Sequence, residues 1–419
     1  MRRGILTLVV VAAVLAAAQP AGAFSFLDRA YGTPELGLSA RSRGMGGAGA
    51  AMGNGVFSLV DNPANLVLLR GNRAQFTGAL SRASENRLVP LFDTFDSFVD
   101  ETAIASNDNG YGDLQGGVVL DNWGSRGVIV SGGVFTRYDP RYDYFDELRT
   151  SDTSDTLRNN KIIQTQGLLR TATVGLALPF GDGSGLGIAV NYYFGTLTDR
   201  EALVSLATSD YASATESRLE RKLDGFSVTL GTSVYVDERL RVGASMETKP
   251  QLHDDYTAWT DGEVTSPEES SGDLELPMRF QGGLTYRPRN TFQTLFAADV
   301  VYTPWSEIVD HLTPDQELQD TWEARFGLEH VFYNKLPGRI GFRYGQSYAM
   351  DEADRVAFTF GFGYLVEQFK IDLAGEVGKT TSRQEPVRPR DEQGVAVGLG
   401  QDHVKDTLFR VSMGVEYGF

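Results

Sequence analysis

The side chains that could perform covalent catalysis are few and scattered along the chain. The 419 residues include no cysteine and four histidines, which are His253, His311, His330 and His403. None of these histidines stands beside a recognisable nucleophile or at metal-ligand spacing, although catalysis of this kind needs a base and a nucleophile brought together. The absence of cysteine also excludes a disulfide framework and thiolate chemistry. We therefore predict that the protein is not an enzyme and has no resident metal or cofactor.

A glycine-rich segment carries a pattern that is spelled like a nucleotide-binding loop. Gly44, Gly46 and Gly49 satisfy G-x-G-x-x-G. A dinucleotide fingerprint needs a preceding strand and a surrounding βαβ unit, and the sequence around this segment predicts neither. Glycines that allow tight turns and close backbone packing are the simpler interpretation. The 55 acidic residues against 38 basic ones argue further against nucleic acid as a partner.

The first residues have the pattern of a secretory signal peptide. Arg2 and Arg3 precede an apolar run, and Ala21-Gly22-Ala23 forms a small-x-small cleavage site. The apolar run, from residue 5 to residue 18, is shorter than the roughly 20 residues of a spanning helix. We predict an export signal over residues 1–23 and a mature start at Phe24.

Alternation of apolar and polar residues predicts transmembrane strands. The end of the chain shows it well, because small or polar residues separate Phe409, Val411, Met413, Val415, Tyr417 and Phe419. A strand with one face in lipid and one face in a wet lumen has this period of two. The ending on Tyr417 and Phe419 resembles the signal by which outer-membrane barrels are recognised for assembly. We therefore expect the barrel assembly machinery and outer-membrane lipids as partners.

The lengths of the connections predict which rim of the barrel faces outward. We count roughly 14 strands from residue 72 onward, within the range of single-chain barrels. Tight turns alternate with long polar links near residues 83–111, 139–165, 200–223, 249–276, 304–320, 347–354 and 380–403. Large external loops and short periplasmic turns produce such an alternation. The sequence thus predicts an all-β, antiparallel transmembrane barrel over 72–419, with a plug over 24–71 that begins at the periplasmic rim.

Two motifs in the predicted plug resemble a known family. Arg43-Gly44-Met45-Gly46-Gly47-Ala48 precedes Asp61-Asn62-Pro63-Ala64-Asn65-Leu66. This order resembles the FadL-type outer-membrane transporters of long-chain fatty acids and other hydrophobic compounds, together with their PorV-like relatives in secretion. The resemblance implies a 14-stranded barrel, sideways exit through the wall, and a hatch in which the gate residues are Gly44, Gly46, Gly47, Asn62, Pro63 and Ala64. A plain turn is the alternative interpretation of Asn62-Pro63-Ala64. Asn65 stands where many relatives have glycine, so transport and secretion both stay open.

Two apolar clusters are predicted to contact ligand. In the first long link, helical spacing predicts a short amphipathic helix with an apolar face formed by Leu91, Phe92, Phe95, Phe98 and Val99. Such a face either covers the barrel mouth or captures a hydrophobic substrate. At the predicted mature start, Phe24, Phe26 and Leu27 are too apolar to remain in water. We expect these three side chains in the lumen, in or beside the ligand pocket.

Together the patterns predict a passive transporter of hydrophobic small molecules in the outer membrane. Long-chain fatty acids are the expected substrates, and movement of the hatch is expected to release them. The alternatives are a PorV-like shuttle or scaffold that binds secreted proteins and a general porin for small polar solutes. An unobstructed lumen would favour the porin, and copurifying secreted cargo would favour the shuttle.

Overall fold

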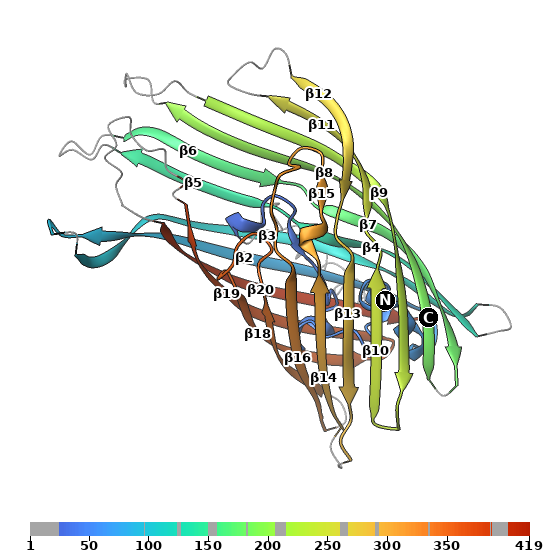
Figure 1. Cartoon of the computed structure of the whole chain (residues 1–419). Coiled ribbons are helices and arrows are strands. Elements are labelled where there is room, and N and C mark those ends of the chain that lie inside the picture. Colours follow the sequence, from blue (N-terminus) through green and yellow to red (C-terminus); the bar gives the residue numbers. More distant parts are fainter. Residues whose placement is uncertain are drawn as a thin grey trace, which may run out of the picture.

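Strands with one apolar face close into a barrel whose lumen holds the N-terminal segment (Figure 1). This computed structural model describes residues 25–95, 97–123, 127–149, 157–181, 183–205, 215–259, 267–289, 293–333, 336–385, 387 and 401–419. The predicted signal peptide and Phe24 lie outside these residues. Within them, no helix is long and apolar enough to cross a membrane.

The wall contains 14 antiparallel strands. They are β2 (Arg73–Phe92), β3 (Phe98–Trp123), β4 (Val128–Asp139), β7 (Leu169–Phe180), β8 (Ser184–Ser205), β9 (Thr215–Tyr235), β10 (Leu240–Glu247), β13 (Arg279–Tyr286), β14 (Gln293–Thr303), β16 (Thr321–Phe332), β17 (Leu336–Gly345), β18 (Arg355–Val366), β19 (Phe369–Gln384) and β20 (Asp402–Gly418). Pairing of β2 with β20, from Arg73 opposite Gly418 to Leu88 opposite His403, closes the barrel. The predicted fold class and strand number are confirmed.

Most of the long links are paired strands rather than irregular loops, which corrects the sequence prediction. Beyond the wall lie β5 (Tyr142–Arg149), β6 (Leu157–Gln166), β11 (Gln251–Trp259), β12 (Glu268–Glu275) and β15 (Val309–Asp310), with one 3-10 turn, η4 (Trp305–Glu307). β5 and β6 form a hairpin that continues the sheet along β8, and β11 and β12 do the same along β9. Backbone groups need partners outside the lipid too, and a strand with both faces wet need not alternate.

The amphipathic helix predicted over residues 91–99 is wrong. β2 continues to Phe92 and β3 begins at Phe98, so this segment is the tip of a long hairpin. Phe95 lies in the turn, where the Asp93 carboxylate accepts hydrogen bonds from two backbone N–H groups. Aspartate favours turns by this local hydrogen bonding, and here the turn outweighs the helical spacing of the apolar residues.

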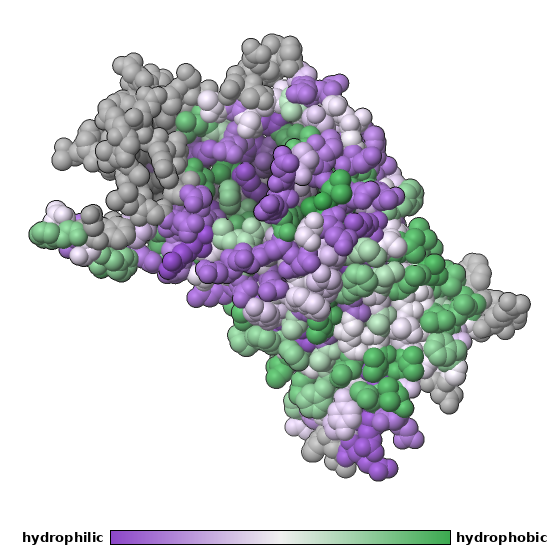
Figure 2. Space-filling view, in the orientation of Figure 1, coloured by the Kyte–Doolittle hydropathy of each residue, from purple (hydrophilic) through white to green (hydrophobic). Residues whose placement is uncertain are grey.

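Apolar side chains cover the outside of the wall. Large exposed residues on its strands include Phe76, Val174, Ile340, Phe358 and Phe362. Figure 2 shows hydrophobic residues gathered over the lower part of the barrel and hydrophilic residues over the extended outer hairpins. The inward positions between the apolar ones are polar or small, as in Thr359 and Gly361 of β18. A barrel of this kind is solvated by lipid on its outer face.

The plug, which here means residues 25–71, descends through the lumen in short turns. Its elements are η1 (Phe26–Asp28), β1 (Thr33–Pro34), α2 (Ala40–Arg43), η2 (Gly55–Phe57), α3 (Ser58–Asp61) and η3 (Pro63–Leu68). The Phe26 ring packs against Tyr142 of β5, in the outer half, and Gly71 precedes β2 at the short-turn rim. The described plug therefore begins in the outer half rather than at the predicted periplasmic rim. Loop parity determines where β2 starts, and it does not determine where the plug begins.

An apolar core fixes the lower plug to the wall. Buried plug residues such as Val56, Phe57, Leu59 and Leu66 form one cluster with inward-facing wall residues of β3, β4, β7, β8 and β14. The Phe57 and Phe135 rings meet edge to face with centroids 5.6 Å apart. Each buried side chain of this size contributes roughly 1.5–3 kcal/mol relative to exposure. The plug is therefore a packed part of the barrel interior.

Candidate functional site

Glycines of the plug interlock with glycines of the wall. Gly46 has φ +70°, and a Cβ atom there would come within 2.5 Å of the Phe342 carbonyl oxygen. Gly47 also has a positive φ, +85°. On the opposing strand, a Cβ at Gly341 would lie 2.1 Å from the Gly46 nitrogen. Gly44 approaches Gly361 in the same way, so the plug backbone lies directly against the wall backbone. The packing interpretation of these glycines agrees with this geometry.

The Asn62-Pro63-Ala64 motif is both a turn and a contact between plug and wall. The side-chain oxygen Oδ1 of Asn62 accepts a hydrogen bond from the Ala64 N–H at 3.1 Å and caps η3, with Pro63 in its first turn. The Asn62 amide donates to the carbonyl oxygens of Ala50 at 2.7 Å and Thr232 at 2.9 Å. The Thr232 contact joins the plug to β9. The gating role that the resemblance implies for this motif stays a prediction.

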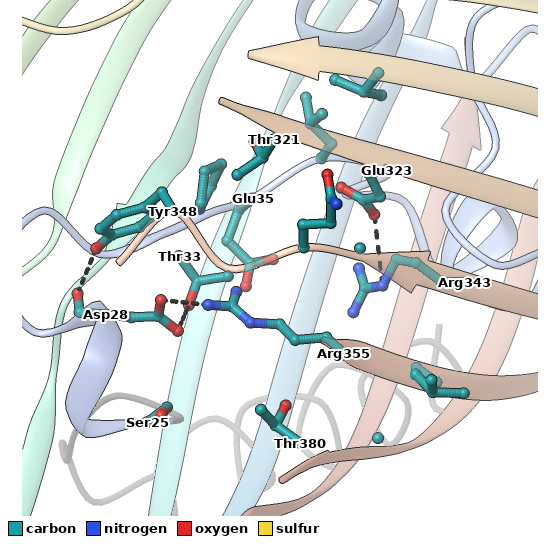
Figure 3. Close-up of a pocket in the computed structure, with 18 of the residues that line it drawn as sticks. Ser25, Asp28, Thr33, Glu35, Thr321, Glu323, Arg343, Tyr348, Arg355 and Thr380 are labelled. Carbon is teal, nitrogen blue, oxygen red and sulfur yellow. Dashed lines mark hydrogen bonds and ion pairs between the residues drawn. The ribbon is translucent and has the colours of Figure 1, made fainter. Parts of the chain in front are cut away.

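A central cavity of about 110 Å³ lies between the upper plug and the wall (Figure 3). The plug contributes Ser25, Asp28 and residues 33–36, and β14 to β20 contribute most of the rest. The charged lining residues are five carboxylates, four arginines and one lysine, namely Asp28, Glu35, Glu323, Glu376, Asp406, Arg279, Arg343, Arg355, Arg410 and Lys379. This cavity is therefore not the entirely apolar pocket that is expected for a long-chain fatty acid.

Ion pairs fasten the upper plug across this cavity. The Glu35 carboxylate accepts hydrogen bonds from the Arg410 guanidinium at 2.8 and 3.2 Å and from Arg43 at 3.3 Å. Burial alone would raise the pKa of Glu35, but the two guanidinium groups outweigh burial and lower the pKa to about 2. Asp28 forms a second pair with Arg355, drawn in Figure 3. Glu35 is thus charged at neutral pH, and both Glu35 and Asp28 are bound to arginines of the wall.

Four aromatic side chains form the apolar side of the cavity region. The Trp305 and Tyr348 rings stack with centroids 4.2 Å apart, and Tyr31 of the plug and Tyr138 of β4 lie 6.1 and 6.3 Å from Trp305. The Tyr31 hydroxyl donates to the Asp310 carboxylate at 3.0 Å. Burial raises the pKa of Tyr31, so the phenol stays protonated. Aromatic faces of this kind are suited to contact with an apolar ligand.

The barrel wall has a seam between β3 and β4, at the level where the plug touches β4. β3 begins at Phe98, but its backbone pairing with β4 begins only at Gly116, which is opposite Val134. All five residues of 135–139 are buried, so β4 loses its alternation and bends into the lumen. There β1 of the plug pairs with Asp139 and Tyr138, while β7 still pairs with β4 as far as Tyr138. The described part of β3 beyond Gly116 consequently has no ladder partner on this side.

Side-chain hydrogen bonds bridge the seam where the ladder stops. The Thr136 hydroxyl donates to the Asp113 carboxylate at 2.9 Å, and the Arg141 guanidinium donates to the Gly112 carbonyl oxygen at 3.0 Å. Farther out, the Asn109 amide donates to a β5 carbonyl oxygen at 2.7 Å. A small cavity of about 10 Å³ lies behind these residues. Because Glu35 and Arg410 line both this cavity and the central one, they stand between the lumen and the seam.

A cluster with metal-ligand chemistry, Asp254, Asp310 and His311, lies above the aromatic group. Their potential ligand atoms all lie within 4.8 Å of one another. The Arg221 guanidinium is 2.6 Å from Asp254 and 2.9 Å from Asp310. This guanidinium already supplies the positive charge between the two carboxylates. The cluster is therefore explained as an ion-pair network that holds β11 and β15 to β9.

The structure places the predicted ligand residues at two separate places. Phe26 packs against Tyr142 and under the Arg29 and Arg87 guanidinium groups, whose centres lie 4.5 and 5.1 Å from the ring centroid. Phe26 and Leu27 are half-buried in the lumen, beside Ser25 and Asp28, which line the central cavity. Phe95 and Phe98 are 85% and 60% exposed at the outer hairpin tip. The side chains of Leu91 and Phe92, like Phe24, lie outside the described residues.

The predicted assembly signal lies at the opposite rim. The Tyr417 ring is near Phe369 and Phe419, with centroid distances of 4.9 and 6.1 Å, and Phe419 is 60% exposed. Such an aromatic group at the membrane interface is typical of outer-membrane barrels. Its role in assembly stays a prediction.

Sequence reasoning missed the buried charges that line the lumen. Glu35, Arg410 and Glu376 fall in segments that look like a polar plug or the wet face of a strand, and their partners are distant in sequence. One signal was present: arginine recurs at inward positions such as Arg325, Arg339 and Arg410 in a chain with excess negative charge. Buried arginines need carboxylate partners, so the plug glutamate was a candidate.

Comparison with known proteins supports the fold. No protein-family model matches the chain, and no curated protein matches its sequence. Among solved structures, a Pseudomonas aeruginosa FadL homologue aligns with a TM-score of 0.67 and 14% identity, over 93% of this chain and 99% of that one. The Pseudomonas putida toluene transporter TodX gives 0.62, 15%, 91% and 98%, and the Ralstonia pickettii toluene transporter TbuX gives 0.59, 18%, 91% and 98%. The chain is a 14-stranded β-barrel with the fold of the FadL-type transporters.

Proposed function

We propose that the protein carries hydrophobic small molecules passively across the outer membrane, through the central cavity and the seam. The observation that carries this proposal is that the two cavities share lining residues from the plug and from the barrel. Glu35 of the plug and Arg410 of β20 border both the central cavity and the small cavity behind the seam. A shift of the upper plug therefore changes the cavity and the route to the seam together.

The size of the cavity supports movement of the plug. An apolar cavity of about 150 Å³ holds a molecule such as benzene, and most ligand pockets measure about 300–1,000 Å³. The central cavity, at about 110 Å³, is smaller than either. Plug residues 25–36 form one side of it, so their displacement is the simplest way to make room. Ion pairs such as Glu35 with Arg410 hold this side closed.

The lining of the cavity supports compact substrates ahead of long-chain fatty acids. Charged side chains surround most of the cavity, and the aromatic group of Tyr31, Tyr138, Trp305 and Tyr348 supplies the compact apolar surface beside it. TodX and TbuX, two of the similar structures, are toluene transporters. We therefore place monoaromatic compounds first and long-chain fatty acids second. The fatty acids predicted from the sequence need a longer apolar path than the described lumen offers.

The plug also bears on the two alternative functions. A general porin needs a water-filled channel, whereas packed plug residues such as Phe57, Leu59 and Leu66 occupy the described lumen. A shuttle for secreted proteins would use the outer rim. That function predicts copurification with secreted cargo and uptake that does not depend on the plug.

A reversible disulfide bond between the upper plug and the wall tests the proposal. Thr33 of β1 and Asp139 of β4 are directly opposite each other, and the chain has no cysteine of its own. Opposed residues in an antiparallel pair have Cβ atoms about 4.5–5.5 Å apart, a separation that a disulfide can span with a small adjustment. The double variant Thr33→Cys with Asp139→Cys should take up toluene when reduced and lose most uptake when oxidised.

A second cysteine pair serves as the matched control. Ala244→Cys with Gly282→Cys joins opposed residues of β10 and β13 on the outer face, where the strands are already paired. Oxidation of this control should leave uptake unchanged. Palmitate uptake and ion conductance are measured in the same preparations. Equal uptake by the oxidised and reduced Thr33–Asp139 variant would show that the plug need not move, and conductance insensitive to the plug lock would favour a porin.

A further inference from the structure

A second cavity, of about 350 Å³, lies at the short-turn rim of the barrel, below the packed lower plug. Plug residues 51–55 line it on one side, and wall residues beside the short turns line it on the other. Its lining includes six cationic side chains and one carboxylate, Glu416. This excess is local, because the whole chain has 55 acidic residues and 38 basic ones. A basic cavity in an acidic protein attracts anions.

Three of the six cations already have carboxylate partners. The Arg41 guanidinium donates to both carboxylate oxygens of Glu329, at 2.9 and 2.7 Å. The Arg73 guanidinium is 2.9 Å from Glu416, and the Lys370 ammonium group is 3.2 Å from another wall carboxylate. The single carboxylate of the lining is therefore already paired.

The other three cations lie together at the lower end of the β10–β13 pair (Figure 1). The Arg287 N–H donates to the Arg239 carbonyl oxygen at 2.9 Å, so these two residues are opposite each other, and Arg241 is the next residue on the same face, opposite Thr285. All three arginines line the cavity. Opposed residues have Cβ atoms about 4.5–5.5 Å apart and diagonal ones about 7–8 Å apart, so the three guanidinium groups repel one another.

Arg241 is the most buried of the three, with 2% of its surface exposed. Its guanidinium lies over the Tyr235 ring, 3.8 Å from the centroid, and one terminal nitrogen donates to the Gly183 carbonyl oxygen at 2.6 Å. Within the described residues, its other terminal nitrogen, Nη1, has no acceptor. Asp237 in the adjoining turn accepts two backbone N–H groups instead. Because a buried guanidinium normally has acceptors for its N–H groups, this site lacks an anion.

We propose that Arg239, Arg241 and Arg287 bind the phosphate group of a ligand at the short-turn rim. The planar fork of a guanidinium matches the oxygens of a phosphate group, and a doubly charged group offsets repulsion among three cations better than a carboxylate does. The cavity volume lies within the range of about 300–1,000 Å³ for ligand pockets. The phosphate group belongs either to a soluble phosphate or to an anionic phospholipid at the rim. The packed lower plug separates this site from the central cavity, so the inference does not depend on what the barrel transports.

Calorimetric titration of the purified barrel with inorganic phosphate, in a non-ionic detergent at pH 7, tests the soluble source. Loss of a hydrogen bond to a charged group weakens binding by about tenfold or more, so Arg241→Gln and Arg287→Gln should each weaken phosphate binding by that factor. Arg218→Gln is the matched control. It removes the same charge from the other end of β9, where Arg218 is 2.9 Å from Glu220, and it should leave phosphate binding unchanged.

Thermal unfolding distinguishes a binding site from a merely structural arginine cluster. Arg287 is exposed, so Arg287→Gln should assemble even if Arg241→Gln does not. Without phosphate, Arg287→Gln should not lower the unfolding temperature, because it relieves repulsion, whereas loss of a structural contact would lower it. Added phosphate should raise the unfolding temperature of the wild type more than that of Arg287→Gln.

Nanodiscs test the phospholipid source. The barrel is placed in phosphatidylcholine with or without phosphatidylglycerol, and the retained lipid is counted by native mass spectrometry. Retention of phosphatidylglycerol by the wild type and by Arg218→Gln, but not by Arg287→Gln, would assign the site to a lipid headgroup. Binding of inorganic phosphate alone, with the same dependence on Arg287, would assign it to a soluble phosphate. Binding of neither probe, or equal binding by all variants, would overturn the proposal.

Discussion

The lower plug, residues 44–69, and the upper plug, residues 25–43, are held in the same lumen by different interactions. The lower plug is fitted backbone to backbone against wall glycines such as Gly341 and carries an apolar core. Its polar contacts with the wall use its own backbone groups. The carboxylate of the wall residue Asp299, for example, accepts hydrogen bonds from the N–H groups of Gly49 at 2.6 Å and Ala50 at 2.8 Å. The upper plug is held mainly by side-chain ion pairs, of which Glu35 with Arg410 is the most buried.

This difference divides the plug into a fixed base, which is the lower plug, and an arm that can move, which is the upper plug. Backbone contacts at close range leave no second position of similar energy, because any shift creates overlap or a void. Ion pairs behave differently, since both partners regain hydration when they separate into water, and the net cost is a small difference between large terms. The cavity and the seam both lie beside the upper plug. We therefore expect substitutions in the base to affect assembly and substitutions in the arm to affect transport.

Gly46→Ala should produce the largest effect, through the base. A side chain at φ +70° costs about 1–2 kcal/mol, and overlap with the carbonyl oxygens of Phe342 and Phe326 adds about 1–3 kcal/mol. We expect failure of assembly, measured as loss of the heat-modifiable band on gels. Gly71→Ala is the control, because Gly71 has φ +75° but no described atom within 4 Å of a new Cβ. Equal defects in the two variants would mean that backbone strain, and not contact with the wall, is responsible.

Glu35→Gln should have the next largest effect, through the arm. The substitution leaves Arg410 and Arg43 buried beside a neutral group, and removal of one partner from a buried pair costs about 3–5 kcal/mol. Because the base remains packed, we expect an assembled barrel with raised ion conductance in planar bilayers. Glu101→Gln, at a half-exposed carboxylate of the outer rim, should leave conductance unchanged. A Glu35 variant that fails to assemble would contradict the separation of arm from base.

Acid should weaken the arm through the same carboxylate. The pKa of Glu35 is lowered from 4.5 to about 2, so its contribution is fully present above about pH 4.5 and is lost as the pH falls through about 2. Conductance of the wild type should therefore stay low from pH 7 to about pH 5 and rise below that. Other carboxylates titrate in this range, so the measurement is the difference between wild type and Glu35→Gln. That difference should shrink towards pH 2.

Asn62→Ala tests the base by a smaller change. It removes the cap of η3 and leaves the carbonyl oxygens of Ala50 and Thr232 without this donor, at a cost of about 1–3 kcal/mol. We expect a lower unfolding temperature and unchanged toluene uptake. Asn109→Ala is the comparison, since it removes one bridge across the seam and should change uptake more than stability. The opposite pattern would place the gate at Asn62-Pro63-Ala64, as the sequence resemblance implies.

The sequence was sufficient for the barrel because lipid imposes a strict rule on every strand. Phe358, Phe360 and Phe362 must face outward, so the period of two is visible without any knowledge of partners. Outside the lipid that rule ends, so the polar sequence of the β5–β6 hairpin predicts a loop although the segment forms paired strands. The apolar spacing at the tip of the β2–β3 hairpin predicts a helix for a similar reason, since this spacing does not reveal the turn that Asp93 forms.

The site could be predicted only in part, because its contacts join distant positions. The glycines and Asn62-Pro63-Ala64 were found, since backbone conformation restricts which residues fit there. The pairing of Glu35 with Arg410 spans 375 positions and leaves no local pattern. The bend of β4 at residues 135–139 is also set by the plug strand β1, which contributes two residues. Such features depend on the folded lumen, which no single segment specifies.

The smallest effect on stability, with a specific effect on uptake, is expected at the outer hairpin tip. Although no helix forms there, Phe95 and Phe98 are 85% and 60% exposed, and apolar residues in water cost little to replace. Capture of a hydrophobic molecule by either ring would bury it, with roughly 1.5–3 kcal/mol available from each full burial. Phe95→Asp with Phe98→Asp should therefore slow uptake at limiting toluene while the unfolding temperature stays the same. Tyr333→Asp, at an exposed aromatic residue of the short-turn rim, should affect neither quantity. If both variants take up toluene at the wild-type rate, the tip has no part in capture, and the contrast between base and arm would account for transport alone.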